Sequence, residues 1–226
     1  MVKRSPGNPV VTSQTLRPLI HKGRGSSSNA SGRFEQHQHA DIDDGWGNLD
    51  VAPPPLRTEV ILDDTRSIIN WVKSPDIPFD RSINPYRGCE HGCIYCFARP
   101  SHTYLGYSAG LDFESRILVK PKAAELLRKE LSKPGYVCQP MALGTNTDPY
   151  QPIEREHRVT REVLEVLAEC RHPLSIVTKS SMVERDIDLL APMAREGLVK
   201  VFISITTFDR ATSRLLEPRA AAPQRR

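Results

Sequence analysis

The feature that most restricts the fold of this chain is an alternation of two patterns that begins at about residue 82. Short apolar runs, typical of buried strands, alternate with longer segments in which apolar residues recur every three or four positions, as on one face of a helix. The runs predict strands at 82–86, 141–145, 174–178 and 199–205. Strands separated by helices form right-handed βαβ units with parallel pairing. The sequence therefore predicts an α/β fold with about four parallel strands and outer helices.

The helical segments fall between and after these strands. We expect helices at 121–132, 156–171 and 183–196, and a loose helical end from Asp209 onward. Pro121 suits the first position of the first helix, where its missing N–H group costs nothing. Pro192 lies in the middle of the third helix and is expected to kink it or split it in two.

The length of this region limits how far a barrel can extend. A complete (β/α)8 barrel takes about 250 residues, so residues 82–226 have room for about four of its units. Four parallel strands do not close on themselves, and one edge stays open. We therefore expect an incomplete barrel, as in an N-terminal fragment, a frame-shifted product or a chain that needs a partner. The strand at 199–205 is almost continuously apolar, which predicts burial of both its faces.

The first quarter of the chain has the composition of a tail. Residues 21–32 are rich in serine and glycine, and no helical or strand period continues through this region. The whole chain has only 38% apolar residues and 19 prolines, so part of it is expected to stay outside any core. We expect a disordered, irregular tail at 1–57 and a core domain at 58–226, with short apolar pieces at 58–62 and 68–72 on its outside.

Charge and hydropathy exclude several classes of protein. The 31 basic and 27 acidic residues give a net charge of +4, too small to indicate nucleic-acid binding by charge alone. No apolar run approaches the length of a membrane span, and the first residues lack the apolar segment of a signal peptide. Five cysteines, an odd number, then indicate thiols or metal ligands and not a disulfide framework. These patterns predict a cytoplasmic protein with no membrane partner.

The segment NPYRGCEHGCIYCF at 84–97 carries the chemistry. Cys89, Cys93 and Cys96 follow the spacing C-x3-C-x2-C, and the glycines between them permit the unusual dihedral angles of a tight loop. A structural zinc site and an ordinary iron–sulfur cluster both use four protein ligands. Three cysteines on a four-iron cluster would leave one iron open to a non-protein ligand. Zinc and free thiols are the alternatives for a motif of this kind.

Other titratable residues near and far from this motif have structural interpretations. Cys138 and Cys170 lie far along the chain and are interpreted as small buried residues, Cys170 on the apolar face of a helix. His91 and Arg87, inside and next to the motif, are interpreted as packing groups or as groups that support the metal ligands.

The cysteine spacing, with Tyr95 directly before the last cysteine, resembles the signature of radical S-adenosylmethionine (SAM) enzymes. The resemblance implies a [4Fe-4S] cluster held by Cys89, Cys93 and Cys96, SAM on the open iron, and Tyr95 in contact with the cofactor. It also implies that one electron, from a reductant such as flavodoxin or ferredoxin, cleaves SAM to methionine and a 5′-deoxyadenosyl radical. That radical abstracts a hydrogen atom from the substrate, while the protein positions the cofactor.

Three further segments resemble the spore photoproduct lyase-like branch of these enzymes, whose members are often labelled DNA repair photolyases. They are 144–154, 176–181 and 201–207, and each follows or ends a predicted strand. The resemblance implies contacts to SAM from Thr147, Asp148, Lys179 and Ser204. The chemistry agrees, because an ammonium group can pair with the carboxylate of methionine, and hydroxyl and carboxylate groups can bond the ribose or the amino group.

Each of these residues also has a purely structural interpretation. Asp148 precedes a proline and can start a turn. Lys179 can be a solvated loop lysine, and the hydroxyl group of Ser204 can bond to the backbone inside a strand. Their positions on successive strand ends favour a shared site, because barrel active sites lie at the C-terminal ends of the strands.

Two positions depart from the pattern of the branch. Thr145 stands where true spore photoproduct lyase has a hydrogen-donating cysteine, and Phe97 stands where it has a tyrosine. We therefore expect a lyase-like radical enzyme that acts on a different substrate, with a nucleic acid as one candidate. A non-catalytic iron–sulfur or zinc-binding module, inactive because it is truncated, is the alternative.

Overall fold

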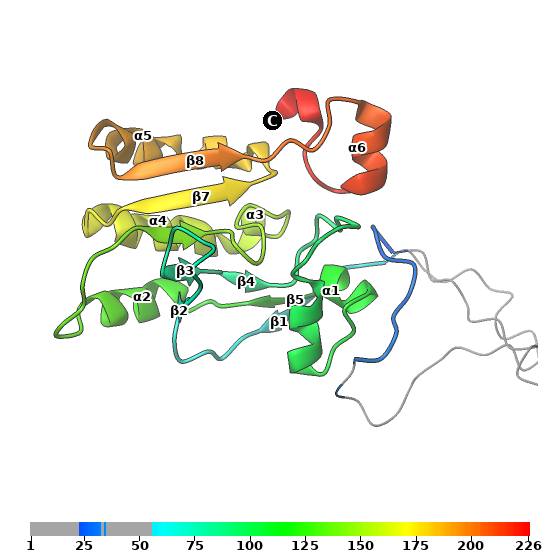
Figure 1. Cartoon of the computed structure of the whole chain (residues 1–226), viewed down its shortest axis with the longest axis horizontal. Coiled ribbons are helices and arrows are strands. Elements are labelled where there is room, and N and C mark those ends of the chain that lie inside the picture. The colour runs from blue at the N-terminus through cyan, green and yellow to red at the C-terminus, as the bar shows by residue number, and fades with distance from the viewer. Residues whose placement is uncertain (1–22, 33, 35–55) are drawn as a thin grey trace, which may run out of the picture.

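The computed structural model describes residues 23–32, 34 and 56–226 of the chain. Two sheets form its centre, and helices connect their strands (Figure 1). The tail predicted at 1–57 falls for the most part outside the described residues. Its described stretch at 23–32 contains no helix or strand and bonds to helix α1 (Leu111–Ser115), whose first N–H group donates to the carbonyl of Ser28 at 3.1 Å.

The larger sheet contains the strands predicted from the sequence. Its order is β2-β3-β6-β7-β8, in which the last four strands run parallel and β2 is antiparallel to β3. The bounds are β2 Ile69–Trp71, β3 Arg81–Ile83, β6 Met141–Leu143, β7 Leu174–Thr178 and β8 Val199–Ile203. The prediction of four parallel strands is confirmed, and the described strands form no closed barrel.

A smaller sheet joins segments on both sides of the cysteine motif. Strand β1 (Glu59–Leu62) pairs in parallel with β5 (Arg116–Val119), which pairs antiparallel with β4 (Tyr86–Arg87). The sequence prediction missed β4 and β5. It placed 58–62 and 68–72 on the outside of the core domain as short apolar pieces, and these segments form β1 and the edge strand β2. Strands of two to four residues carry too little periodicity to be separated from loops.

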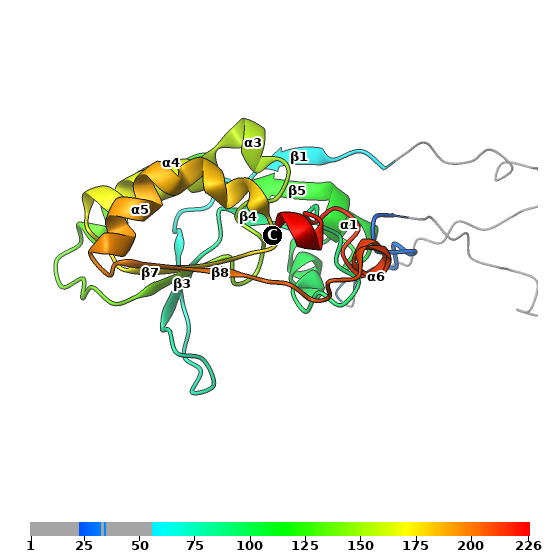
Figure 2. The same cartoon turned by 90° about the horizontal axis from the view of Figure 1, so that it is seen from above.

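Helices connect the parallel strands and cover one face of the larger sheet, as Figure 2 shows for α4 and α5. Besides α1, the helices of the described chain are α2 Ala123–Leu131, α3 Glu154–His157, α4 Val159–Glu169, α5 Ile187–Arg195 and α6 Arg210–Leu216, with 3-10 helices at Arg99–Leu105, Ser181–Asp186 and Pro223–Arg225. The predictions at 121–132, at 156–171 and from Asp209 are confirmed as α2, α4 and α6. The predicted helix at 183–196 starts later, and Pro192 lies inside α5 without splitting it. In the described part of the chain, no helix is long and apolar enough to cross a membrane.

The core lies between the larger sheet and helices α2, α4 and α5. Ile83, Leu143 and Ile176 from neighbouring strands are buried, as are Val163 and Leu167 on one face of α4. Full burial of a side chain of this size contributes roughly 1.5–3 kcal/mol to stability. This layer therefore fixes β3, β6 and β7 relative to one another, and with them the positions of their C-terminal ends.

The prediction that the strand at 199–205 is buried on both faces is wrong. In β8 only Val199 is buried, whereas Val201, Phe202 and Ile203 are 39%, 52% and 36% exposed. β8 is the last strand of the sheet, and α4 and α5 lie over one face of that sheet (Figure 2). Its apolar composition therefore reflects a face that these described residues leave open.

Candidate cofactor site

The three motif cysteines lie on a loop of residues 88–98, here called the cysteine loop, that follows β4. Gly88 and Gly92 adopt φ angles of 81° and 66°, the left-handed region that glycine tolerates best. A Cβ atom on Gly88 would lie 2.7 Å from the carbonyl oxygen of Phe113. The same oxygen accepts the N–H group of Cys89 at 2.9 Å. Glycine thus permits the close approach that anchors the loop.

The side chains of Cys89, Cys93 and Cys96 line one cavity of about 390 Å³, here called the cofactor cavity. Burial, together with the neighbouring Cys89 thiol, raises the pKa of Cys93 to about 12. Within the described residues, no three Cys, His, Asp or Glu side chains are placed to hold a single metal ion. The three thiols line one space. Three thiolates would fit a four-iron cluster with one open iron, whereas a closed structural zinc site uses four protein ligands.

Residues from three successive strand ends line the same cavity. Thr147 and Asp148 follow β6, Lys179 follows β7 and Ser204 follows β8. Parallel strands present their C-terminal ends at one edge of the sheet, which brings these side chains together although they are far apart in sequence. The structure therefore places the four residues with the cysteines, as the sequence indicates, and their contacts to SAM stay a prediction.

Asp148 fixes the shape of the loops around the cofactor cavity. Its Oδ1 accepts the Thr178 hydroxyl at 2.7 Å and the Tyr150 N–H at 2.9 Å, and its Oδ2 accepts the Lys179 N–H at 2.7 Å. The Nδ1 atom of His91 lies 3.3 Å from the same Oδ2. Burial alone would raise the pKa of Asp148, but His91 and these hydrogen bonds hold it below its ordinary value. Asp148 therefore acts as an anion that orders the site.

Lys179 places its ammonium group between two strand ends. Its Nζ donates to the Ser204 hydroxyl at 3.1 Å and lies 4.0 Å from Oε1 of Glu217. The hydroxyl of Thr147, in contrast, is buried and donates to the carbonyl of Tyr86 at 3.3 Å. A ligand in the cavity can therefore reach Lys179 and Ser204. The Thr147 hydroxyl already donates its hydrogen bond to a backbone carbonyl.

Tyr95 is not among the residues that line the cofactor cavity. Its side chain is 48% exposed, and its hydroxyl bonds to Thr206 at 2.8 Å and to Glu217. The Nζ atom of Lys179 lies 5.9 Å from the centre of its ring. The structure thus places Tyr95 beside Lys179 and outside the lining of the cofactor cavity.

The helical end from Asp209 onward is packed against the cysteine loop and is not loose. The Ile94 N–H donates to the carbonyl of Leu216 at 3.0 Å. The buried Glu217 accepts hydrogen bonds from Thr206 and Arg226, both at 2.5 Å. Sequence analysis missed this role of Glu217, because an acid after a short helix carries no local pattern that distinguishes a buried anion from a solvated one.

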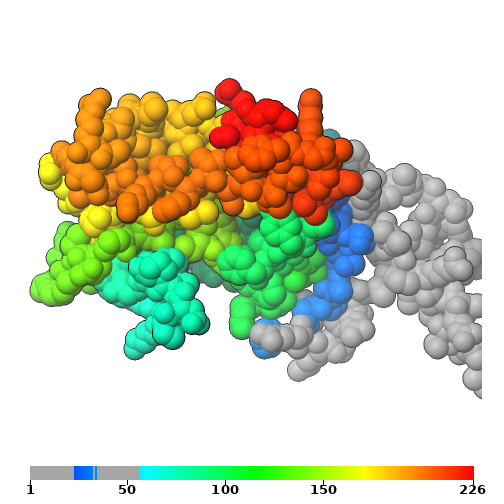
Figure 3. Space-filling view, turned by 45° about the horizontal axis from the view of Figure 1, so that its top comes forward, coloured from blue at the N-terminus to red at the C-terminus, as the bar shows by residue number. Residues whose placement is uncertain are grey.

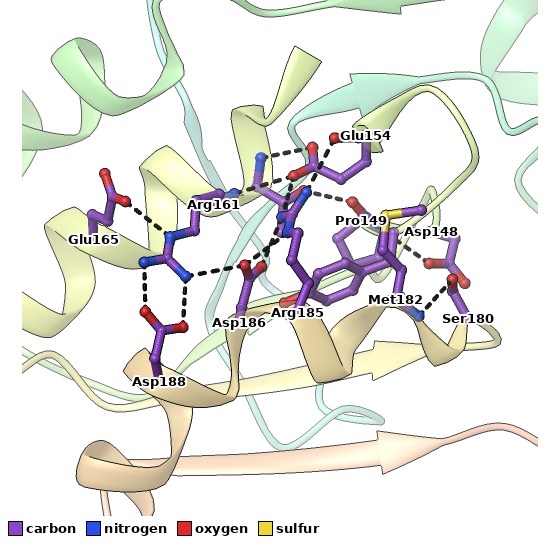
Figure 4. Close-up of polar contacts among 12 residues, drawn as sticks. Asp148, Pro149, Glu154, Arg161, Glu165, Ser180, Met182, Arg185, Asp186 and Asp188 are labelled. Carbon is purple, nitrogen blue, oxygen red and sulfur yellow. Dashed lines mark hydrogen bonds and ion pairs between the residues drawn. The ribbon is translucent and has the colours of Figure 1, made fainter. Parts of the chain in front are cut away.

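Behind Asp148 lies a buried polar cluster of Glu154, Arg161, Arg185 and Asp186, here called the acid–arginine cluster (Figure 4). Oε1 of Glu154 accepts Arg185 at 2.7 Å, and Asp186 accepts Arg185 at 2.8 Å and Arg161 at 3.3 Å. Both acids are fully buried. Opposite charges and hydrogen bonds make their burial tolerable. The cluster ties α4 to the segment that follows Lys179.

The interpretation of Cys138 and Cys170 as buried residues is wrong, because both are exposed. Cys138 lies in the connection before β6, and Cys170 follows the last residue of α4, past its buried face. Neither side chain lines the cofactor cavity. Their separation from the cysteine loop agrees with their exclusion from the predicted ligand set.

The described N-terminal stretch packs against the cysteine loop. The fully buried Glu114 accepts the N–H groups of residues 24–26 at 2.6 to 3.2 Å. A Cβ atom on Gly92 would lie 3.2 Å from the nitrogen of Gly25, so the two segments are in close contact. Residues 23–32 therefore form part of the wall around the cysteine loop, although they belong to the predicted tail.

Gly144, at the end of β6, offers a test of how tightly the cavity is built. Its φ is 87°, and an added Cβ would meet the Val177 carbonyl oxygen and lie 2.7 Å from Cδ of Pro149. We expect Gly144→Ala to lower the free energy of unfolding by about 3 kcal/mol, measured by urea denaturation. Gly135→Ala is the control, because its φ is 82° but its Cβ would meet nothing within 4 Å. Gly135→Ala should lower the free energy of unfolding by only about 1 kcal/mol. Equal losses in the two variants would contradict the steric argument.

Comparison with known proteins identifies the family. The model of the radical SAM superfamily matches residues 83–226. An uncharacterized protein of Mycobacterium tuberculosis is 41% identical over 162 residues, which cover 71% of this chain and 48% of that protein. An uncharacterized protein of Methanocaldococcus jannaschii is 28% identical over 75% of this chain and 60% of that protein. No solved structure matches the chain. The chain thus spans about half the length of the mycobacterial relative.

The family match covers the residues that build the cofactor cavity. It begins within β3 and includes the cysteine loop and the ends of β6, β7 and β8. Members of the superfamily bind a [4Fe-4S] cluster and S-adenosylmethionine, and the three thiols around one cavity fit the first of these groups. The chain belongs to the radical SAM superfamily.

Proposed function

We propose that this chain binds a [4Fe-4S] cluster through Cys89, Cys93 and Cys96 and cleaves SAM reductively to start radical chemistry on a substrate. One observation supports the proposal above all: the three cysteines and residues from three strand ends line the same cavity. Three thiolates leave one iron without a protein ligand, which is where SAM would bind. The bound cluster supplies the electron that splits SAM into methionine and a 5′-deoxyadenosyl radical.

The residues of the strand ends have different roles in this proposal. Lys179 pairs with the carboxylate of the methionine part of SAM, and Ser204, 3.1 Å from its Nζ, bonds the same part. Asp148 is a positioning residue, because it holds the Lys179 N–H at 2.7 Å and fixes the start of that loop. Thr147 holds the loop after β6 through its bond to the backbone. Tyr95 acts on the cofactor through Lys179, whose ammonium faces its ring.

Two aromatic residues would help to exclude water from this reaction once a substrate covers them. Phe79 and Phe97 both line the cofactor cavity, and Phe97 is 80% exposed. A reactive radical needs a dry site in which it meets only its substrate. A substrate that covers these rings would remove their apolar surface from water and close the open side of the cavity at the same time.

We further propose a lyase-like reaction of the spore photoproduct lyase-like branch, on a substrate other than a thymine photoproduct. Thr145 and Phe97 both line the cavity, and neither side chain readily donates a hydrogen atom. A nucleic acid is one candidate substrate, and a flavodoxin or ferredoxin is the candidate reductant in the cytoplasm.

The non-catalytic module is not favoured, because cluster and SAM chemistry is general in the superfamily. Since the chain spans about half of its mycobacterial relative, the activity and partners of a whole protein are part of this proposal.

Anaerobic reconstitution with iron and sulfide tests the proposal. We expect a brown protein with about four irons per chain. After reduction with dithionite, it should release 5′-deoxyadenosine and methionine from SAM, measured by liquid chromatography and mass spectrometry. A colourless chain that binds zinc, or a four-iron protein that leaves SAM intact, would contradict it.

Lys179→Ala tests the proposed SAM contact separately from the cluster. It removes a charge partner and no iron ligand, so the iron content should stay unchanged while SAM affinity falls. A charge-assisted hydrogen bond contributes roughly 1.5–3 kcal/mol, which corresponds to about a tenfold or larger loss in affinity by calorimetry. Lys200→Ala is the control, because Lys200 lies near the start of β8, away from the strand ends, is exposed and does not line the cavity. Unchanged affinity in the Lys179 variant would return this residue to a purely structural role.

A further inference from the structure

A second cavity of about 470 Å³, here called the side cavity, adjoins the cofactor cavity. The two share four lining residues, namely Phe79, Phe97, Thr145 and Asn146. In Figure 3 a hollow separates the cyan connection between β2 and β3 from the green residues that follow the cysteine loop. A molecule in the side cavity would therefore lie directly next to a ligand in the cofactor cavity.

One of the residues that line the side cavity is a buried lysine. Lys120, which follows β5, is 4% exposed, and its Nζ donates to the carbonyl of Asn84 at 2.8 Å. Among the described residues, no carboxylate lies within ion-pairing distance of this Nζ. An ammonium group has three N–H donors, and a buried cation without an anion is costly. Two of its donors are thus available to a ligand.

The charge of this group is kept at neutral pH. Burial, together with the nearby Arg87 guanidinium, lowers the pKa of Lys120 to about 8. Asp63 opposes this shift but bonds to Arg87 at 2.6 Å, so its charge is already paired. Below a pH of about 8 the ammonium form of Lys120 predominates, and an anion placed beside it would gain both a charge partner and hydrogen bonds.

The rest of the lining suits a small polar molecule. Ser67, Asn70, Ser82 and Ser101 line the side cavity together with Lys120, and Phe79 and Phe97 are shared with the cofactor cavity. Pockets for small ligands measure about 300–1,000 Å³ and combine apolar walls with a few polar groups. The side cavity meets both conditions.

We propose that the side cavity receives the substrate and that Lys120 binds an anionic group of it, a carboxylate or a phosphate. This inference rests on the proposed function, because it takes the adjoining cavity as the place where the radical forms. The aromatic rings between the cavities would hold the reacting carbon near SAM, while Lys120 holds the charged end at a distance. Lys120 then determines which substrates are accepted and takes no part in the cleavage of SAM.

Calorimetry of the cluster-free chain with inorganic phosphate and, separately, with acetate tests this site and distinguishes the two anion classes. We expect Lys120→Met, which keeps an unbranched side chain but removes the charge, to weaken binding of at least one anion about tenfold or more. Lys122→Met is the matched control, because Lys122 is 67% exposed and does not line the side cavity. The Lys122→Met variant should bind each anion with the same affinity as the unchanged chain. Lys120→Arg, which keeps the charge, should bind the anions with an affinity within a few-fold of the unchanged chain. Retained binding in this variant would show that the loss in Lys120→Met comes from the missing charge and not from misfolding.

The outcome for Lys120 can be separated from that for the proposed function. Equal affinity of the unchanged chain and Lys120→Met, or no saturable binding of either anion, would overturn the inference even if SAM is cleaved normally. The reconstituted Lys120→Met variant should cleave SAM without substrate at an unchanged rate. A loss of that cleavage with an intact cluster would also overturn it, because Lys120 would then serve SAM. Failure of the unchanged chain to assemble a cluster would instead refute the proposed function.

Discussion

Replacing any one of Cys89, Cys93 and Cys96 by alanine is expected to abolish the iron–sulfur absorbance of the reconstituted chain. Each cysteine lines the same cavity, and the described part of the cavity wall offers no fourth cysteine that could replace a lost ligand. Metal affinity depends on the full set of deprotonated ligands, so the loss of one thiolate removes most of the binding free energy. Iron content and visible absorbance after anaerobic desalting measure the result, which should fall from about four irons per chain to nearly none.

Cys138→Ala and Cys170→Ala are the matched controls for this experiment. Both residues are exposed and lie away from the cofactor cavity, so their replacement should leave the spectrum unchanged. A requirement for Cys138 would mean that the site uses four cysteines and that the open iron does not exist. An unchanged spectrum for all three motif variants would mean that the iron binds elsewhere.

Glu154→Ala is expected to destabilise the fold strongly. The carboxylate is fully buried and accepts the Tyr86 hydroxyl, the Thr160 N–H at 2.9 Å and Arg185 at 2.7 Å. Removing one partner of a buried ion pair leaves the remaining charge and donors unpaired, which costs about 3–5 kcal/mol. Urea denaturation followed by circular dichroism should show this loss in the free energy of unfolding.

Glu165→Ala provides the comparison for Glu154. Glu165 also pairs with a member of the acid–arginine cluster, Arg161 at 2.9 Å, but it is 44% exposed (Figure 4). An exposed pair at this helical spacing contributes only about 0.3–0.5 kcal/mol. Similar losses in the two variants would mean that water reaches Glu154 and that the cluster does not hold α4 in place.

The sequence predicted the parallel strands and their helices because each of these elements has a periodic apolar pattern of its own. The strand at 174–178 matches β7 residue for residue, and α2 and α4 lie within their predicted ranges. The error on β8 has a different origin. A strand that is apolar on both faces looks buried in sequence, but burial depends on whether another element covers it, and the described chain covers one face.

Two parts of the candidate site were predictable from the sequence: the loop that carries the three cysteines and the residues at the strand ends. Three cysteines within eight residues must lie on one loop, and strand-end residues must share an edge of the sheet. The roles of Asp148 and Tyr95 were not predictable in the same way. Their side chains bond to Lys179 and to Glu217, which approach through tertiary packing, and no local pattern encodes such a partner. Glu114 and Lys120 were missed for the same reason.

The contact between Glu114 and residues 24–26 also bears on how iron could reach the thiols. It joins segments about 90 residues apart through a few hydrogen bonds, away from the apolar core. Ordering the backbone of such a stretch costs about 1–2 kcal/mol per residue, which hydrogen bonds worth about 0.5–1.5 kcal/mol each recover only in part. This wall should therefore open as a separate, low-energy event while the sheet stays folded. Amide hydrogen exchange at residues 24–26 should then be much faster than in β6 and β7. The rate of cluster loading would then depend on how often this local opening occurs and not on the global stability of the protein.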